Sequence, residues 1–401
     1  MSSKPRFGGE KVRLGDCFPY IKNGYNVRQG KDKGGMPITR IETLSDNRFN
    51  RDKVGYADIF STEGLENHIL EDGDILMSHI NSLPYLGRSV MYRARPGEVF
   101  IHGMNLLRLK ADRSVVEPGY AELYFRSPRF KQHVLKIAKK AVNQASFSVS
   151  DLKEIEFPLM SLCDQHDVIE KLSSVTTQTE HCQRAIGKLD SLVKSRFIEM
   201  FGDLSGYESR TLKECVSGIE SGKSPKCLAK PREGNNPGVL KLSAISSGIY
   251  KETENKALPS DAKATDGRVV CDGDILLARK NTPELVGQSV FVNHTDGNIM
   301  FPDIVFRMHA KYEVDGVYLS YALAHPLAGA IKSLAHGSAK SMSNIPKSEL
   351  VRLPIPLPPL ALQREFAAFV SQVDKSRFIA QQQIEKLQML YDSLAQDYFG
   401  D

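Results

Sequence analysis

The chain has 401 residues, of which 41% are apolar and 25% are charged, and its formal net charge is +5. It contains no run of 18 apolar residues and starts without an apolar signal segment, so we expect a cytoplasmic protein that does not span a membrane. Its six cysteines have no Cys-x-x-Cys spacing, which favours reduced core residues over a zinc site.

The first predicted domain covers residues 1–155. It holds 25 Lys and Arg against 18 Asp and Glu, an excess that suits a polyanionic partner without requiring one. Short β-branched runs at 74–77 and 89–92 predict strands, and residues 118–141 predict one helical stretch. Because helices do not alternate with these strands, we expect an irregular α+β fold and no doubly wound sheet.

Residues 156–203 predict a long helix. From Val168 to Met200, large or apolar residues recur at alternating steps of four and three, which is the heptad pattern of a coiled coil. Residues 354–401 repeat this pattern, and each run of about 33 residues would reach about 50 Å. We expect the two helices to pair as an antiparallel coiled coil. The predicted seam consists of Val168, Leu172, Val175, Ile186, Leu189 and Val193 in the first helix and Val370, Val373, Ile384, Leu387, Tyr391 and Leu394 in the second.

The third predicted segment, residues 204–353, repeats the first domain. Leu14 and Cys17 return as Leu212 and Cys215, and the sequence Gly-Asp-Ile-Leu occurs at both 73–76 and 273–276. A second helical stretch is expected at 315–334. The order of domain, helix, domain, helix therefore predicts a tandem duplication.

Signatures of catalysis are absent from the sequence. Gly218 and Gly222 are separated by three residues where a phosphate-binding loop needs four, and the ten histidines form no metal-binding pair. The segment 235–238 lacks the aromatic motif of an adenine methyltransferase. These observations predict a chain without catalytic activity of its own.

Polar loops at equivalent places in the two domains carry residue types that contact base edges and phosphates. Any single loop of this kind is equally consistent with a solvated surface, but a shared framework with different loops predicts two readers of different DNA sequences. The candidate DNA contacts are Arg28, Arg40, Asn81, Lys139, Lys140, Asn143 and Gln144 in the first domain and Lys223, Lys226, Lys241, Arg279, Lys280, Asn281, Lys340 and Asn344 in the second. The competing interpretation is a non-catalytic coiled-coil scaffold whose basic domains bind no specific sequence.

The segment from Ile345 to Leu350, the run Leu353-Pro-Ile-Pro-Leu-Pro-Pro-Leu360 and Gln363 resemble the lead into the conserved helix of the specificity subunits of type I restriction–modification enzymes. The Gly-Asp-Ile-Leu blocks and Gly222-Lys-Ser-Pro225 are similar to that family's target recognition domains. The resemblance covers essentially the whole chain. It departs at Met160-Ser161, where the double proline is missing, and at Tyr25-Asn26, which replace Lys223-Ser224.

This resemblance implies a subunit of a host-defence complex that recognises a DNA sequence. Each domain would read one half of a bipartite asymmetric site in double-stranded DNA, while the helices set the spacing and dock two DNA methyltransferase subunits. The resemblance places S-adenosylmethionine, ATP and Mg in those methyltransferase subunits and in the restriction (translocase) subunits, and it implies no cofactor in this chain.

Overall fold

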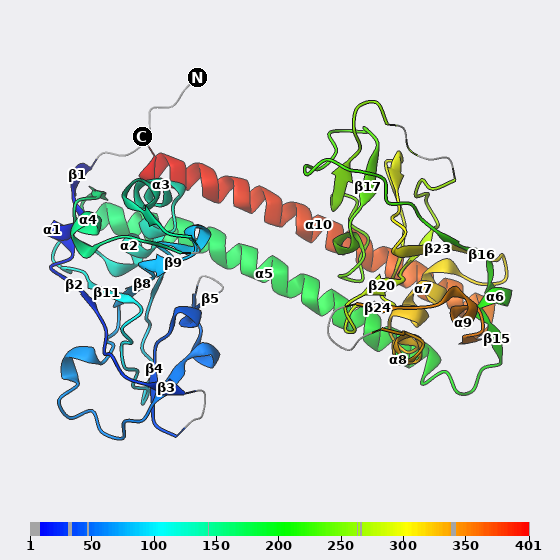
Figure 1. The fold of residues 1–401 in the computed structure, drawn as a ribbon, viewed down its shortest axis with the longest axis horizontal. Coiled ribbons are helices and arrows are strands. Elements are labelled where there is room, and N and C mark those ends of the chain that lie inside the picture. Colours follow the sequence, from blue (N-terminus) through cyan, green and yellow to red (C-terminus); the bar gives the residue numbers. More distant parts are fainter. Residues whose placement is uncertain are drawn as a thin grey trace. The chain divides into compact units, whose positions relative to one another are not determined.

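The computed structural model describes residues 9–30, 34–45, 48–142, 144–262, 264, 267–337 and 342–400. The chain divides into two compact units, and Figure 1 labels helices and strands that belong to each. Unit 1 consists of Met1–Gln183 with Gln381–Asp401, and unit 2 consists of Arg184–Ala380. In the described ranges, no helix combines the length and apolar character that crossing a bilayer requires.

The core of unit 1 is an antiparallel sheet with the strand order β10-β8-β11-β2. Its central strand, β8, is buried on both faces, because Ile75 and Met77 point into one hydrophobic cluster and Leu76 into another. These strands are β10 (Ser89–Met91), β8 (Ile75–Met77), β11 (Leu107–Lys110) and β2 (Tyr20–Asn23).

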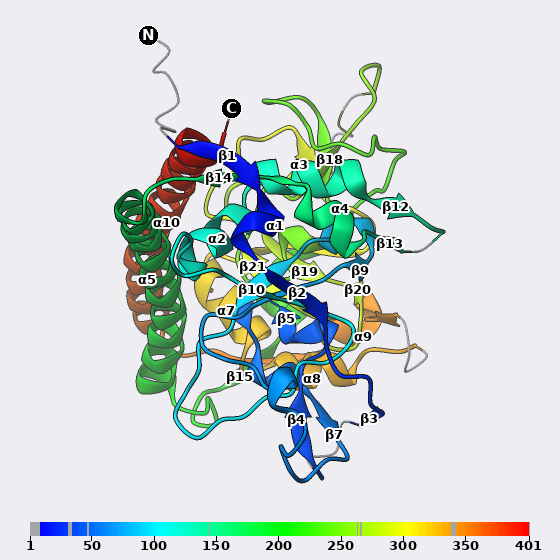
Figure 2. The ribbon, with the colours of Figure 1, turned by 90° about the vertical axis from the view of Figure 1, so that its left-hand side faces the viewer.

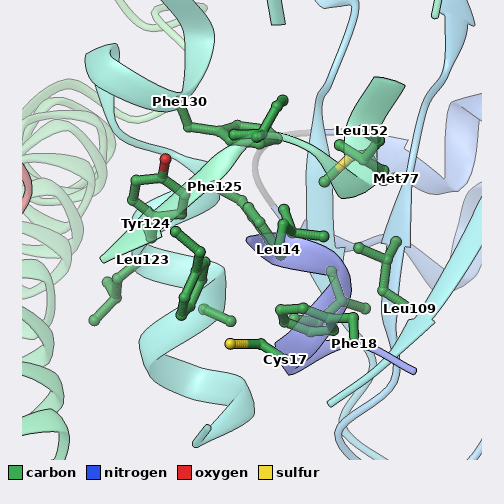
Figure 3. Packing of buried hydrophobic residues seen from close by; sticks show 14 of the residues in the cluster. Leu14, Cys17, Phe18, Met77, Leu109, Leu123, Tyr124, Phe125, Phe130 and Leu152 are labelled. Atoms are coloured by element: carbon green, nitrogen blue, oxygen red, sulfur yellow. The ribbon is translucent and has the colours of Figure 1, made fainter. Parts of the chain in front are cut away.

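Helices cover one face of this sheet. Figure 3 shows Phe125 and Phe130 packed near Leu14 and Phe18 in the buried cluster. The helices of the domain are α1 (Leu14–Cys17), α2 (Pro118–Phe125), α3 (Pro128–Ile137) and α4 (Val149–Lys153). The other face is filled by a smaller cluster that includes Phe49, Tyr92 and Phe100.

The single helical stretch expected at 118–141 is wrong in one respect, because the chain forms two helices and a strand there. The hydroxyl of Ser127 accepts a hydrogen bond from the backbone N–H of Phe130 (3.2 Å) and caps α3. Pro128 has no N–H to continue the preceding helix and fits the first helical position. This pair of residues starts a new helix.

The other strands of unit 1 are short. β1 pairs with β14, as Figure 2 shows, and β12-β13-β9 and β3-β7-β4 form two further sheets. Their bounds are β1 (Glu10–Arg13), β3 (Gln29–Gly30), β4 (Met36–Ile38), β5 (Leu44–Ser45), β6 (Arg48–Phe49), β7 (Gly55–Ala57), β9 (Ile80–Asn81), β12 (Lys139–Lys140), β13 (Ala145–Ser146) and β14 (Glu156–Leu159), with 3-10 turns at η1 (Ile41–Thr43), η2 (Arg51–Lys53), η3 (Glu66–His68) and η4 (Leu83–Tyr85).

Unit 2 repeats this topology. Its main sheet has the order β16-β23-β19-β21, which corresponds strand for strand to β2-β11-β8-β10. The bounds are β15 (Ser209–Thr211), α6 (Leu212–Cys215), β16 (Val216–Ser221), β17 (Gly238–Leu240), η5 (Leu242–Ala244), β18 (Asn255–Ala257), β19 (Ile275–Ala278), β20 (Lys280–Asn281), β21 (Ser289–Phe291), β22 (Ile299–Met300), β23 (Val305–Ala310), α7 (Gly316–Ala324), α8 (Ala328–Ser333), β24 (Ser343–Asn344), α9 (Lys347–Leu350) and β25 (Pro354–Pro356). The predicted duplication and α+β class are confirmed.

The two long helices are α5 (Leu162–Phe201) and α10 (Leu360–Phe399), each of 40 residues. In unit 1, Val168 and Leu172 of α5 lie in one cluster with Ala395 of α10. In unit 2, Val193 of α5 lies in one cluster with Val373 of α10. The start of each helix therefore packs on the end of the other, which confirms the antiparallel coiled coil.

The predicted seam residues are all buried or half-buried. Arg377 lies between the seam residues Val373 and Ile384 of α10, and it forms an ion pair with Asp190 of α5 at 2.6 Å and a second one with Asp374 of its own helix. Burial raises the pKa of the Asp374 carboxyl, which also accepts a hydrogen bond from Asn293 (3.0 Å). The charge in this seam is thus neutralised by partners from both helices.

Candidate nucleic-acid interface

In unit 1, two predicted polar loops meet in a small sheet. β13 pairs with β9 and with β12, so that Ala145 lies opposite Asn81 and Ser146 lies opposite Lys139. The backbone N–H of Ala141 donates to the carbonyl of Gln144 (2.8 Å) and closes the hairpin. The hairpin places Lys139, Lys140 and Gln144 on the surface beside Asn81, and all but Asn81 are exposed. Asn143 lies outside the described residues.

In unit 2, β20 pairs with β24 in the same way, with Lys280 opposite Asn344 and Asn281 opposite Ser343. The Nε of Arg279 donates to Oδ1 of Asn344 (3.1 Å), and its guanidinium carbon lies 5.2 Å from the centre of the Phe306 ring. The structure thus gathers Arg279, Lys280, Asn281 and Asn344 into one cluster. Lys340 lies outside the described residues.

Asn81 and Asn281 play a matching structural role. The Oδ1 of Asn81 accepts from the backbone N–H of Ser82 and the Oδ1 of Asn281 from that of Thr282, both at 2.8 Å. The Nδ2 of Asn81 donates to Ser78 (3.1 Å), whereas the buried Nδ2 of Asn281 has no partner among the described residues. Each side chain therefore initiates a turn, and DNA contact by either asparagine remains a prediction.

The loops after β2 and β16 are held by equivalent glycines. A Cβ on Gly24 would lie 2.2 Å from the carbonyl oxygen of His102, and one on Gly222 would lie 2.0 Å from that of Phe301. Only glycine allows this approach. The glycines position exposed cations in the loops that follow, namely Arg28 in unit 1 and Lys223 and Lys226 in unit 2.

Arg40 and Lys241 also occupy equivalent positions, at the starts of η1 and η5. The Nζ of Lys241 lies 3.0 Å from Glu254, and the Nε of Arg40 lies 4.0 Å from Glu42. Both cations are half-buried beside carboxylates, and no contact found in the described ranges joins them to the hairpin residues. DNA contact by Arg40 and by Lys241 remains a prediction.

A buried ion pair anchors the central strand of each unit. Asp74, which precedes β8, lies 2.6 Å from Arg108, and both side chains are buried. Its counterpart Asp274 lies 3.9 Å from Arg307 and 2.9 Å from His309. Burial raises the pKa of both aspartates despite the neighbouring arginines. The repeated Gly-Asp-Ile-Leu motif pointed to the aspartates but not to their partners.

The sequence does not indicate that Phe306 contacts Arg279 or that Asn23 contacts His79. Phe306 lies under the Arg279 guanidinium, and the Nδ2 of Asn23 lies 3.1 Å from Nε2 of His79. Each pair joins residues that are far apart in the sequence, so no local pattern indicates the contact. Among the residues that the structure describes, no group of three His, Cys, Asp or Glu side chains is placed to hold a metal ion.

Comparison with known proteins gives a consistent result. Residues 8–188 match the family model of the type I restriction modification DNA specificity domain. The chain is 30% identical to the type I restriction enzyme MjaX specificity subunit of Methanocaldococcus jannaschii, over 94% of this chain and 90% of that protein. It is 34% identical to the type I restriction enzyme EcoEI specificity subunit of Escherichia coli, over 39% of this chain and 27% of that protein.

A solved structure supports the fold. The crystal structure of the type I restriction–modification system S subunit from M. genitalium aligns with 100% of this chain and 98% of that chain, with a TM-score of 0.57 and 15% sequence identity. At that identity the match concerns the fold alone. The extended sequence identity to the M. jannaschii protein carries the assignment, and the chain belongs to the family of type I restriction–modification specificity subunits.

Proposed function

We propose that this chain is the DNA-recognition subunit of a type I restriction–modification complex, and that each unit reads one half of a bipartite asymmetric site in double-stranded DNA. The observation that carries the proposal is that the two units place different side chains at equivalent positions. The β9–β13 pairing of unit 1 and the β20–β24 pairing of unit 2 have the same topology, but one presents Lys139, Lys140 and Gln144 and the other presents Arg279 and Asn344.

The domain boundaries follow from the same proposal. Residues 1–155 and 204–353 are the two target recognition domains, and residues 156–203 and 354–401 are the conserved helical segments. The basic excess of residues 1–155 suits contact with phosphates, which supplies much of the affinity for DNA. Side chains in the paired strands would then supply the sequence discrimination.

The helices are proposed to dock two methyltransferase subunits and to set the spacing between half-sites. Large apolar side chains remain exposed on α10, where Phe378 is 62% exposed, Ile379 is 65% exposed and Met389 is 73% exposed. Exposed apolar groups of this size on a soluble helix are typical of protein interfaces. The chemistry would belong to the partners, with S-adenosylmethionine in the methyltransferase subunits and ATP with Mg in the restriction subunits.

Methylation mapping tests the proposal. The chain is co-expressed with the adenine methyltransferase subunit encoded in the same genome, and methylated adenines are located by long-read sequencing. One bipartite motif with a fixed gap is the expected result. Methylation without sequence preference would contradict it.

The scaffold interpretation makes a different prediction. A scaffold would show no preference among duplexes and no steep loss of binding with salt. A sequence reader should prefer one duplex at every salt concentration, while its affinity for all duplexes falls as salt rises. Binding of the purified complex to matched and scrambled duplexes over a salt series distinguishes the two.

A further inference from the structure

His79 and Arg279 occupy the same place in the two units. Each lies between the central strand of its sheet and the following short strand, β8 and β9 in unit 1 and β19 and β20 in unit 2. The carbonyl of His79 accepts a hydrogen bond from the backbone N–H of Phe147 (3.2 Å), and that of Arg279 accepts one from Ile345 (3.0 Å). The backbone is therefore equivalent and only the side chains differ.

The surroundings of Arg279 hold its guanidinium from two directions. Its Nε donates to Oδ1 of Asn344 (3.1 Å), and its plane lies near the ring of Phe306. Within the described residues, no carboxylate forms an ion pair with Arg279 and no acceptor bonds its terminal nitrogens. The side chain is half-exposed. A guanidinium fixed through Nε and through one face presents its two terminal nitrogens as a parallel pair of donors.

The equivalent side chain in unit 1 is buried and cannot point outward. His79 is only 9% exposed, and its Nε2 lies 3.1 Å from Nδ2 of Asn23. Since the amide nitrogen is a donor, Nε2 of the ring is the acceptor in this bond. Burial lowers the pKa of His79, so the ring is neutral at neutral pH. His79 thus offers no outward pair of donors.

The neighbours of the two residues differ together. Phe306 lies opposite Leu277 in the sheet of unit 2, and Leu107 lies opposite Met77 in unit 1. Asn344 lies opposite Lys280, and Ser146 lies opposite Ile80. The set Arg279, Phe306 and Asn344 is thus replaced by His79, Leu107 and Ser146. A leucine gives no aromatic face and a serine reaches less far, so unit 1 lacks both supports.

We propose that Arg279 reads a guanine in the half-site of unit 2, with Asn344 and Phe306 as positioning residues. Guanine presents O6 and N7 as two adjacent acceptors in the major groove, and a guanidinium contacts both. Unit 1 has no such reader at the equivalent position, so the two half-sites differ there. This inference rests on the proposed function, because it assumes that unit 2 contacts base pairs.

The variant Arg279→Gln tests the inference in the complex with the methyltransferase subunit. Glutamine removes the charge and favours adenine over guanine. We expect the preference for guanine at one position of one half-site to fall by about 5- to 150-fold in kcat/KM for methylation. The other half-site and the gap should stay unchanged. Asn344→Ser, which installs the residue type of Ser146, should give a smaller loss at the same position.

Arg352→Gln is the matched control. Arg352 is an exposed arginine of the same unit outside the cluster, and its substitution removes the same charge. It should leave the motif as it is in the parent complex. Equal loss of methylation at all sequences in Arg279→Gln, with the guanine preference retained, would indicate a phosphate contact and would overturn the inference.

A substrate-side experiment needs no variant. Each guanine of both half-sites is replaced in turn by 7-deazaguanine, which lacks the N7 acceptor, and methylation by the parent complex is measured. We expect one position at which the replacement reduces kcat/KM, and no effect there in Arg279→Gln. The inference is overturned if no replacement changes kcat/KM of the parent complex, or if the methylated motif contains no guanine. A parent complex that methylates no bipartite motif contradicts the proposed function instead.

Discussion

The side chain of Gln363 accepts a hydrogen bond from the backbone N–H of Asp315 at 2.9 Å and thereby joins α10 to the start of α7. Its amide nitrogen donates to the carbonyl of Pro358 (2.7 Å), and the side chain is buried. In unit 1, Gln165 accepts from Glu117 and donates to Met160, both at 2.8 Å. One buried glutamine therefore fixes each globular domain to its own long helix.

Gln363→Ala should destabilise unit 2. The substitution leaves the Asp315 N–H and the Pro358 carbonyl without their partner, and an unsatisfied buried group costs about 1–3 kcal/mol. Urea unfolding should show a lower midpoint, and hydrogen exchange at the Asp315 amide should be faster. Gln372→Ala, at an exposed position of the same helix, is the control and should change neither. Equal exchange at Asp315 in both variants would contradict this role.

The sequence predicted features that repeat locally or at a fixed offset. The heptad spacing identified the seam because helix periodicity is a property of neighbouring residues. The offset that relates Leu14 and Cys17 to Leu212 and Cys215 also relates Gln165 to Gln363, but it does not reveal Glu117 and Asp315 as the partners of these glutamines.

The candidate interface was only partly predictable. The polar loops were identified, yet the pairing of β9 with β13 joins two-residue strands, which are too short to show an alternating pattern. The support of Arg279 by Phe306 likewise depends on strand register in a sheet. Pro128 marks the helix break in the sequence itself, and the prediction of one continuous stretch overlooks it.

Gly222→Ala should disturb the loop that carries Lys223. The new Cβ would lie 2.0 Å from the carbonyl oxygen of Phe301, which accepts a hydrogen bond from the Lys223 N–H (3.1 Å). Because backbone must move to relieve this contact, we expect a loss of about 1–3 kcal/mol in the free energy of unfolding. Scanning calorimetry should show a lower melting temperature.

The control for Gly222→Ala is Gly218, which lies in β16, the strand that precedes the loop. Gly218 is exposed, and a Cβ there would have no atom within 4 Å. Gly218→Ala should keep or slightly raise the melting temperature, because alanine loses less backbone entropy on folding. If the two variants had the same melting temperature, the approach of Phe301 to Gly222 would not constrain the fold.

We expect protonation of Glu98 to account for part of the loss of stability of unit 1 at acid pH. Its carboxylate accepts hydrogen bonds from Nε of Arg51 (2.8 Å) and from the hydroxyl of Tyr92 (3.0 Å). The Arg51 bond is the main cause that holds the pKa of Glu98 below its usual 4.5. A carboxyl group with a lowered folded pKa stabilises the protein above its unfolded pKa, and this stabilisation is lost as the pH falls through the folded pKa.

Glu98→Gln should therefore lower the free energy of unfolding near neutral pH. It should also make the fall in stability below pH 4.5 shallower than in the parent. Urea unfolding across an acid pH series measures both effects. Glu63→Gln, which changes an exposed carboxyl of the same unit, should leave the pH profile unchanged. A parallel pair of profiles for Glu98→Gln and the parent would show that this carboxyl does not contribute.

The paired helices predict a measurable relation between helix length and the gap in the DNA site. The 2.6 Å ion pair between Asp190 and Arg377 marks one level of the antiparallel pair. One heptad inserted into both helices beside these residues keeps the seam in register and adds about 10 Å. At about 3.4 Å per base pair, the methylated motif should then accept a gap about 3 base pairs longer. A heptad in one helix only should break the register and abolish methylation, while an unchanged gap after the double insertion would show that the helices do not set the spacing.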